Sequence, residues 1–348
     1  MRATVMHGAG DVRLEDLPDP VVQRPTDALV RIVASCVCGS DLWGYRGVNP
    51  QDGPRQMGHE FVGVVEDVGT EVRTVRPGDF VIAPFAISDG TCAACRNGIH
   101  TSCERGGYWG GEVRAGYPTG GGQAEYVVSP FADGTLVATP EAPDQDLVPS
   151  LLSLSDVLGT GHHAAVSAKV GKGDTVVVVG DGAVGLSAVL AAARLGAERI
   201  VAMSRHADRQ ALATDFGATD IVSARGDDGV QEVRDLLSGG ADAVLECVGT
   251  KQSMDQALYS VRPGGRIGYV GVPAGGPEFP VRHLFSNNIS VAGGVAPVRA
   301  YLPELLTDVL NRKINPGKVF DADYSLTTVA DAYADMDNRK VVKPLLRP

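Results

Sequence analysis

The pattern of apolar and polar residues changes character near residue 150. Before this point, short apolar and β-branched runs such as 28–35, 60–68 and 79–85 are separated by Gly, Pro and Asp. That spacing predicts a compact, loop-rich and mostly antiparallel β domain. One glycine-rich segment, 105–122, is expected to form a long surface loop.

After residue 150, apolar runs alternate with alanine-rich, helix-like stretches. We expect strands at 175–180, 199–204, 242–249, 266–272 and 289–294, with helices at 186–197, 208–218 and 253–261. Continuous apolar strands between helices are typical of a parallel sheet covered on both faces. The stretch 295–348 begins with an amphipathic helix and returns to β-like sequence, so we expect it to fold back onto the first domain.

The predicted fold class is therefore α/β with two domains. The first, a β-rich domain, is expected to be discontinuous and to comprise residues 1–152 and 295–348. The second, a Rossmann domain with a doubly wound parallel sheet, is expected over residues 153–294.

Composition narrows the classes of partner. The chain has 348 residues, and 31 Lys and Arg against 42 Asp and Glu give a net charge of −11, which disfavours binding to nucleic acid or an anionic membrane. No apolar run approaches the roughly 20 residues of a membrane helix, and the N-terminal stretch carries charges where an export signal would be apolar. We expect a cytoplasmic protein with a small-molecule substrate, in which the six cysteines are ligands or core residues rather than disulfides.

A glycine-rich turn marks a candidate nucleotide site. Gly180, Gly182 and Gly185 match the pattern GxGxxG directly after a predicted strand and before a helix, with Ala183 and Val184 between them. The first glycine permits the tight turn, the second lets the backbone approach a pyrophosphate, and the third allows close packing of helix on strand. The N–H groups at the start of the helix would bind the phosphates.

The end of the second Rossmann strand indicates which nucleotide is bound. Sheets that bind NAD usually carry Asp or Glu there to hold the ribose 2′-hydroxyl. This strand ends instead in Ser204 and Arg205, with Arg209 one turn further on. Because a hydroxyl and a guanidinium suit a 2′-phosphate, we predict NADP(H) as the cofactor; surface arginines without a ligand are the alternative.

Two groups of residues carry metal-binding chemistry. Cys38, His59 and Asp156 offer a thiolate, an imidazole and a carboxylate, which zinc accepts while leaving a fourth position open in catalytic sites. Spacing alone does not select these three, because a lone Cys or His is more often a core or surface residue. The second group reads Asp89, Cys92, Cys95 and Cys103.

Taken together and in this order, these motifs resemble the zinc-containing alcohol dehydrogenases of the medium-chain dehydrogenase/reductase superfamily. The motifs are Cys38-Gly-Ser-Asp, Gly-His59-Glu60, the Asp156 to Gly161 segment, the cysteine lobe and the glycine-rich turn, and they extend over essentially the whole chain. The NADP-dependent bacterial secondary-alcohol dehydrogenases are similar in having Asp at position 156 and Ser-Arg after the second Rossmann strand. The resemblance implies that the first domain is a GroES-like catalytic domain.

The resemblance also assigns roles at the catalytic site. It implies zinc ligands at Cys38, His59 and Asp156, and makes Glu60 a transient fourth ligand. Ser40 would hydrogen-bond the substrate oxygen, and Asp41 would orient a ligating imidazole. Trp43 stands where the family commonly has the histidine at the outer end of its proton relay, so this relay is in doubt and Trp43 is expected to form an apolar wall of the substrate pocket.

The second group matches the structural-zinc lobe of the family, which has four cysteines. Cys92, Cys95 and Cys103 fit the spacing, and Asp89 occupies the position of the first cysteine. A structural zinc held by one aspartate and three cysteines is therefore expected. The alternatives are a lobe without metal, a Cys92–Cys95 redox pair, and His100 in place of Asp89.

The function expected from these residues is hydride transfer between NADP(H) and an alcohol and its ketone or aldehyde, with zinc activating the oxygen. A polyol or sugar dehydrogenase is the alternative with the same chemistry. A zinc-free quinone or enone reductase and a non-catalytic nucleotide-binding protein are further alternatives. The resemblance implies a homodimer or homotetramer, formed through the edge strand at 289–294.

Overall fold

The computed structural model describes residues 1–48, 53–273 and 279–348 and divides the chain into two compact units. Unit 1 comprises Met1–Gly159 and Pro297–Pro348, and unit 2 comprises Thr160–Ala296. The sequence places these divisions after residues 152 and 294. In the structure, α5 (Val157–Ser167) spans the first division.

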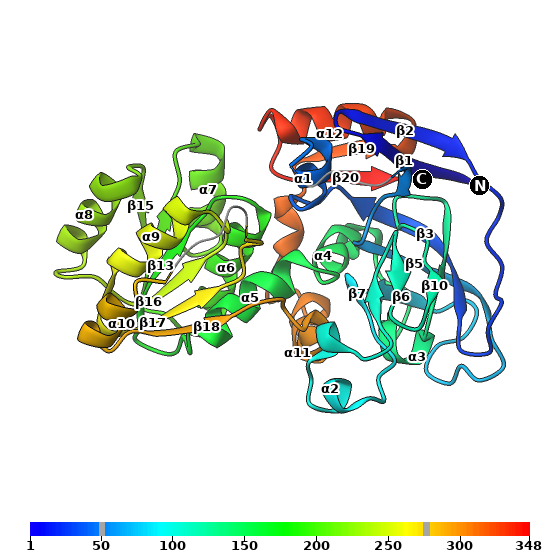
Figure 1. The fold of residues 1–348 in the computed structure, drawn as a ribbon, viewed down its shortest axis with the longest axis horizontal. Helices are drawn as coiled ribbons and strands as arrows, with labels where there is room; N and C mark the ends of the chain where they lie inside the picture. The colour runs from blue at the N-terminus through cyan, green and yellow to red at the C-terminus, as the bar shows by residue number, and fades with distance from the viewer. Residues whose placement is uncertain (49–52, 274–278) are drawn as a thin grey trace. The chain divides into compact units, whose positions relative to one another are not determined.

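Unit 1 is built from β-strands, as the short apolar runs predict (Figure 1). Its largest sheet has seven strands in the order β12-β6-β5-β3-β20-β19, with β11 also paired to β3. These strands are β3 (Ala28–Cys36), β5 (Phe61–Val68), β6 (Phe80–Ala83), β11 (Tyr126–Ser129), β12 (Val137–Ala138), β19 (Ala322–Ser325) and β20 (Pro344–Arg347). All pairs are antiparallel except β19 with β20. The C-terminal segment thus completes a sheet that the N-terminal segment begins.

Smaller sheets and short helices surround this sheet. The other strands are β1 (Arg2–Gly8), β2 (Asp11–Asp16), β4 (Arg55–Gln56), β7 (Ala86–Ile87), β8 (Gly107–Tyr108), β9 (Glu112–Val113) and β10 (Tyr117–Pro118). The α-helices are α1 (Asp41–Tyr45), α2 (Ala93–Arg96), α3 (Ala132–Thr135), α4 (Val148–Ser153), α11 (Val298–Leu310) and α12 (Val329–Asp337). The 3₁₀ helices are η1 (His100–Ser102), η2 (Gln145–Leu147), η3 (Pro316–Val319) and η4 (Leu326–Thr328).

The segment 105–122 is only in part the surface loop expected from its glycines, since turns and bends alternate in it with short strands. It contains β8, β9 and β10, and it places Trp109, Val113 and Tyr117 in the core beside Phe61. The Trp109 and Phe61 rings meet edge to face, with centroids 4.8 Å apart. Large aromatic side chains bury enough apolar surface to fix a glycine-rich segment, and this contribution was underestimated from composition.

Unit 2 is a single parallel sheet in the order β15-β14-β13-β16-β17-β18 (Figure 1). Its strands are β13 (Thr175–Val179), β14 (Arg199–Met203), β15 (Asp220–Val222), β16 (Ala241–Glu246), β17 (Val261–Tyr269) and β18 (Ser290–Gly293). Its helices are α6 (Ala183–Arg194), α7 (Ala207–Asp215), α8 (Gly226–Leu236), α9 (Lys251–Ser260) and α10 (Val281–Asn287). This is the doubly wound order of the predicted Rossmann sheet, and the predicted α/β class is confirmed.

The strands of unit 2 are buried on both faces. Val177 and Val179 of β13 lie in a core with side chains of α8 and α9. Because side chains alternate along a strand, Val176 and Val178 point to the other face, and they are equally buried. There α6 contacts β13. This explains why β13 has a continuous apolar run rather than alternation.

Helices α8 and α10 were not expected. The signal for α8 is present in the sequence, since Val230, Val233 and Leu237 recur at helical spacing, but the acidic start of this segment obscures it. Across the described residues, 1–48, 53–273 and 279–348, no helix is long and apolar enough to cross a membrane.

Candidate active site

Three backbone segments of unit 1 meet where β3 ends and β5 begins. Cys38 lies two residues after β3, His59 and Glu60 directly precede β5, and Asp156 directly precedes α5. Ser35 of β3 is paired with Phe61 of β5 in antiparallel register, so the end of one strand lies beside the start of the other. One potential ligand atom from each of Cys38, His59, Glu60 and Asp156 lies within 4.8 Å of every other.

The spacing of these atoms suits a tetrahedral metal ion. Cys38 Sγ lies 3.8 Å from Asp156 Oδ2, and His59 Nε2 lies 3.5 Å from the same oxygen. Zinc bonded to sulfur, nitrogen and oxygen at its usual lengths separates ligand atoms by about 3.4–3.8 Å. The donor set and its geometry therefore fit zinc. Ser40 Oγ is 3.5 Å from His59 Nε2 and lies at the edge of the same group.

A chain of buried polar groups orients His59. Its Nδ1 is 3.4 Å from Asp41 Oδ1. Asp41 Oδ2 accepts hydrogen bonds from the Cys38 backbone N–H at 2.9 Å and from Gln123 Nε2 at 3.4 Å, and Gln123 accepts one from the Tyr333 hydroxyl at 3.1 Å. Burial by itself lowers the pKa of His59, but the charges of Asp41 and Cys38 outweigh it and raise this pKa well above the usual value. Such partners fix which ring nitrogen faces a metal.

Glu60 is held by a lysine from the far end of the chain. Lys343 Nζ lies 2.7 Å from Glu60 Oε1, and both side chains are 0% exposed. Glu60 Oε2 is also buried and has no hydrogen-bond partner among the described residues. Burial opposes the charge of Lys343, but the neighbouring Cys36 and Glu60 outweigh it and raise its pKa well above the usual value. An unpartnered carboxylate oxygen within the ligand cluster again fits a metal ion, because leaving it unsatisfied is costly.

The second group of ligands forms around α2. Ligand atoms of Asp89, Cys92, Cys95 and Cys103 all lie within 4.8 Å of one another, and Cys92 Sγ is 3.5 Å from Cys95 Sγ. His100 is not part of this set among the described residues. Backbone hydrogen bonds from Cys95 and Glu104 lower the pKa of Cys92, which favours the thiolate that zinc binds.

The glycine-rich turn lies at the carboxyl end of β13. At Gly185 a Cβ would come within 2.0 Å of the Gly180 carbonyl oxygen, so this position requires glycine for packing. At Gly182 a Cβ would meet nothing within 4 Å, and φ is −78°. Packing and backbone strain therefore do not require glycine at position 182, and the open space fits a ligand that approaches the backbone there. Gly182 is also the N-cap of α6, with Ala183 and Val184 in its first turn.

The residues predicted to bind a 2′-phosphate differ in exposure. Arg205 is exposed, whereas Ser204 is 2% exposed and Arg209 is 8% exposed. Ser204 and Arg209 both contact Asp181, the second residue of the glycine-rich turn.

Comparison with known proteins places this architecture in a family. Residues 24–141 match the alcohol dehydrogenase GroES-like domain, and residues 183–311 match the zinc-binding dehydrogenase model. A probable zinc-binding alcohol dehydrogenase of Mycobacterium tuberculosis is 36% identical over 336 residues, which cover 96% of this chain and 85% of that protein. The chain belongs to the zinc-binding alcohol dehydrogenase family. The predicted resemblance and the GroES-like and Rossmann architecture are thereby confirmed.

Other members extend the comparison. The solved structure of the alcohol dehydrogenase TADH from Thermus sp. ATN1 has a TM-score of 0.90 and 34% identity, with 100% of this chain and 99% of that chain covered. A sorbitol dehydrogenase of Bacillus subtilis is 29% identical over 95% of this chain and 92% of its own length. The family implies zinc, and it includes dehydrogenases named for alcohols and for a polyol.

Within this dehydrogenase, several residues at the sites were missed from the sequence. Three of them contact partners that are distant in sequence, so no local motif indicates them. They are Lys343, which contacts Glu60, Gln123, which contacts Asp41, and Asp181, which contacts Ser204. Trp43, which replaces the expected relay histidine, lies on α1 and is half-buried. Of the aromatic residues in segment 105–122, Tyr108 stacks on Phe85, with ring centroids 6.2 Å apart, and Phe85 in turn meets the His59 ring edge-on.

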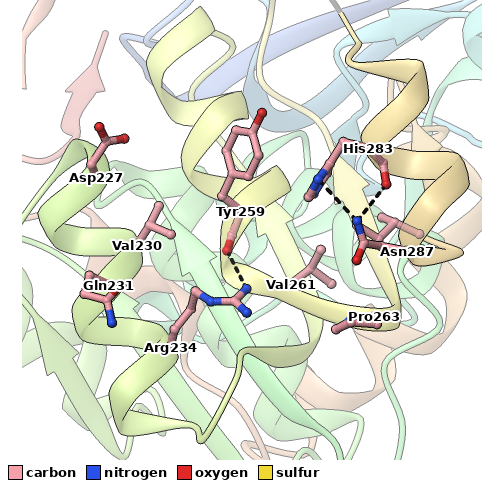
Figure 2. Close-up of a pocket in the computed structure, with 10 residues that line it drawn as sticks. Asp227, Val230, Gln231, Arg234, Tyr259, Val261, Pro263, His283 and Asn287 are labelled. Carbon is pink, nitrogen blue, oxygen red and sulfur yellow. Dashed lines mark hydrogen bonds between the residues drawn. The ribbon is translucent and has the colours of Figure 1, made fainter.

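Unit 2 also has a hollow away from the glycine-rich turn, with a volume of about 510 Å³ (Figure 2). It lies among α8, α9, β17 and α10, and it is lined by Asp227, Val230, Gln231, Arg234, Tyr259, Val261, Pro263, His283, Asn287 and Ile289. Polar groups around it bond to the backbone, as Arg234 does to the Tyr259 carbonyl (Figure 2). None of the residues predicted to bind metal or nucleotide, all within the described part of the chain, lines this hollow.

Proposed function

We propose that this protein is a zinc-dependent alcohol dehydrogenase, equivalently a carbonyl reductase, that uses NADP(H). The observation that carries the proposal is the convergence of Cys38, His59, Glu60 and Asp156 within 4.8 Å, with the Ser40 hydroxyl beside them. The comparisons support the reaction class. The substrate and the choice of NADP(H) are part of the proposal.

Each residue has a distinct task in this proposal. Cys38, His59 and Asp156 would hold the zinc, and Asp41 would keep His59 Nε2 directed toward it. When bound, zinc would act as a Lewis acid toward the alcohol or carbonyl oxygen, and the nicotinamide would accept or donate the hydride. Ser40 Oγ hydrogen-bonds the substrate oxygen and takes or returns its proton. Trp43 limits the pocket on an apolar side.

The second cluster is proposed to bind a structural zinc. Asp89 Oδ1 accepts hydrogen bonds from the backbone N–H groups of Thr91 at 2.8 Å and Cys92 at 3.0 Å. These hydrogen bonds hold the carboxylate beside the three sulfur atoms. Burial raises the pKa of Asp89, but these hydrogen bonds outweigh it and lower this pKa. The carboxylate is therefore ionised at neutral pH, as a ligand must be.

The proposal also includes the nucleotide and the assembly. Gly180, Gly182, Ala183, Val184 and Gly185 would bind the pyrophosphate at the start of α6. Ser204, Arg205 and Arg209 would bind the 2′-phosphate, with Arg205 as the exposed cation. We further propose a homodimer or homotetramer in the cytoplasm, where the six cysteines, all free thiols here, would remain reduced.

A polyol or sugar dehydrogenase is the second candidate, because a sorbitol dehydrogenase is among the relatives. One experiment separates the candidates. The purified protein is assayed with NADPH and NADH against ketones, aldehydes, sugars and their alcohols, with 1,10-phenanthroline as chelator and its non-chelating 1,7 isomer as control. Chelator-sensitive turnover supports the zinc reaction, and the best substrate chooses between alcohol and polyol. Chelator-insensitive reduction of quinones or enones contradicts it.

The choice of nucleotide has its own test. Arg205→Asp places a carboxylate at the end of β14, so we expect the ratio of kcat/KM for NADPH to that for NADH to fall by at least tenfold. An unchanged ratio would remove Arg205 from the nucleotide site.

A further inference from the structure

A carboxylate reaches the end of β14 from a different segment of the chain. Asp181 is the second residue of the glycine-rich turn, and its Oδ2 accepts a hydrogen bond from Ser204 Oγ at 2.8 Å. Ser204 directly follows β14. Sheets that bind NAD present an acidic side chain at this end of the second strand, where it holds the ribose 2′-hydroxyl. Here the acid comes from the turn that follows the neighbouring strand β13 and lies at hydrogen-bond distance from Ser204.

This carboxylate is held in place from both sides. Arg209 Nη1 lies 3.5 Å from Asp181 Oδ1 and donates to the Asp181 carbonyl oxygen at 3.3 Å. The side chains of Asp181 and Arg209 are 12% and 10% exposed. Because opposite charges at this distance offset each other, Arg209 offers a 2′-phosphate less attraction than a cation without a carboxylate beside it.

We propose that Asp181 is a specificity-determining residue that counteracts the preference for NADP(H). The inference rests on the proposed function, since it concerns the nucleotide site of that enzyme. The Asp181 carboxylate accepts a hydrogen bond from the ribose 2′-hydroxyl of NAD(H) and repels the 2′-phosphate of NADP(H). Arg205 attracts that phosphate. The site therefore binds both nucleotides, and the ratio of their affinities depends on Asp181.

The test is direct binding of nucleotides to the zinc-loaded protein without substrate, followed by the fluorescence of NADH and NADPH. Asp181→Asn keeps the size of the side chain and removes its charge. A hydrogen bond to a charged group contributes about a tenfold or greater change in affinity. We expect NADH to bind at least tenfold more weakly to the variant, NADPH to bind more tightly, and the ratio to change by more than tenfold.

A matched variant separates a specific role of Asp181 from a general effect of charge. Asp208→Asn removes the same charge from an exposed residue in the first turn of α7, and it should change the affinity ratio by less than threefold.

The outcomes distinguish this inference from the proposed function. An unchanged ratio of the affinities for NADH and NADPH in Asp181→Asn, or an equal loss of affinity for both, overturns the role of Asp181. The proposed function can still hold in that case, because it is tested separately by chelator-sensitive turnover. If the unmodified protein binds neither nucleotide, the proposed function fails, and the inference fails with it.

Discussion

Replacing Lys343 by methionine tests whether the buried ion pair with Glu60 stabilises unit 1. Methionine keeps most of the apolar stem but removes the ammonium, which lies 2.7 Å from Glu60 Oε1 and 3.2 Å from the Val37 carbonyl oxygen. Both partners are 0% exposed, so water cannot replace the lost contact. Removing one partner of a buried pair leaves an uncompensated charge and costs about 3–5 kcal/mol.

That cost is a large part of the stability of a typical domain, which is about 5–15 kcal/mol. Urea unfolding followed by tryptophan fluorescence is a suitable assay, because both tryptophans, Trp43 and Trp109, belong to unit 1. We expect the free energy of unfolding of unit 1 to fall by about 3–5 kcal/mol in Lys343→Met. The additional replacement Glu60→Gln should restore part of this loss, because it removes the uncompensated charge.

Lys340→Met is the matched control. Lys340 lies 2.8 Å from Asp335 but is 67% exposed, and ion pairs in water contribute little to stability. If Lys343→Met destabilises unit 1 no more than Lys340→Met does, the pair does not have the electrostatic role inferred from its burial.

Three further outcomes are expected. Asp89→Ala should lower the zinc content by one ion per chain, measured by elemental analysis; unchanged stoichiometry would exclude Asp89 as a ligand. Gly182→Ala should weaken nucleotide binding at least tenfold and leave the melting temperature unchanged. Gly185→Ala should lower the melting temperature, because its Cβ would lie 2.0 Å from the Gly180 carbonyl oxygen. Equal effects of the two changes on the melting temperature would contradict the assignment of Gly182 to the nucleotide and of Gly185 to packing. The bidentate hydrogen bonds from Arg199 lower the pKa of Asp220 to about 2, against about 3.9 in an unfolded chain. The stabilisation of the folded protein by this ion pair is therefore complete above about pH 4 and is lost as the pH falls toward 2. The destabilisation by Asp220→Asn, about 1 kcal/mol for a partly exposed pair, should decrease over that range in urea titrations. A constant difference would rule out this linkage.

The parts of the structure that depend on local pattern could be predicted from the sequence. The continuous apolar runs of unit 2 gave its strands, and the GxGxxG motif gave the turn before α6, because both signals lie within a few neighbouring residues. The surroundings of the sites could not be predicted in this way. Lys343 meets Glu60 only because β20 pairs with β3, and Asp181 meets Ser204 only because β13 and β14 are neighbours. The burial of aromatic side chains in segment 105–122 could not be predicted either, because their contacts involve residues distant in sequence, such as Phe61.

The division of unit 1 into two sequence segments has a consequence for the order of events during synthesis. Glu60 is synthesised 283 residues before Lys343. Its carboxylate therefore has no ion-pair partner from Lys343 during the synthesis of unit 2. Unit 2 is continuous and can fold first, as domains generally do during translation. Its two ends adjoin neighbouring points of unit 1, since a Cβ on Gly159 would lie 2.9 Å from Val298. Once folded, unit 2 thus shortens the loop that must close before β20 reaches β3, and loop closure becomes less costly in entropy. Unit 2 would thereby assist the folding of unit 1.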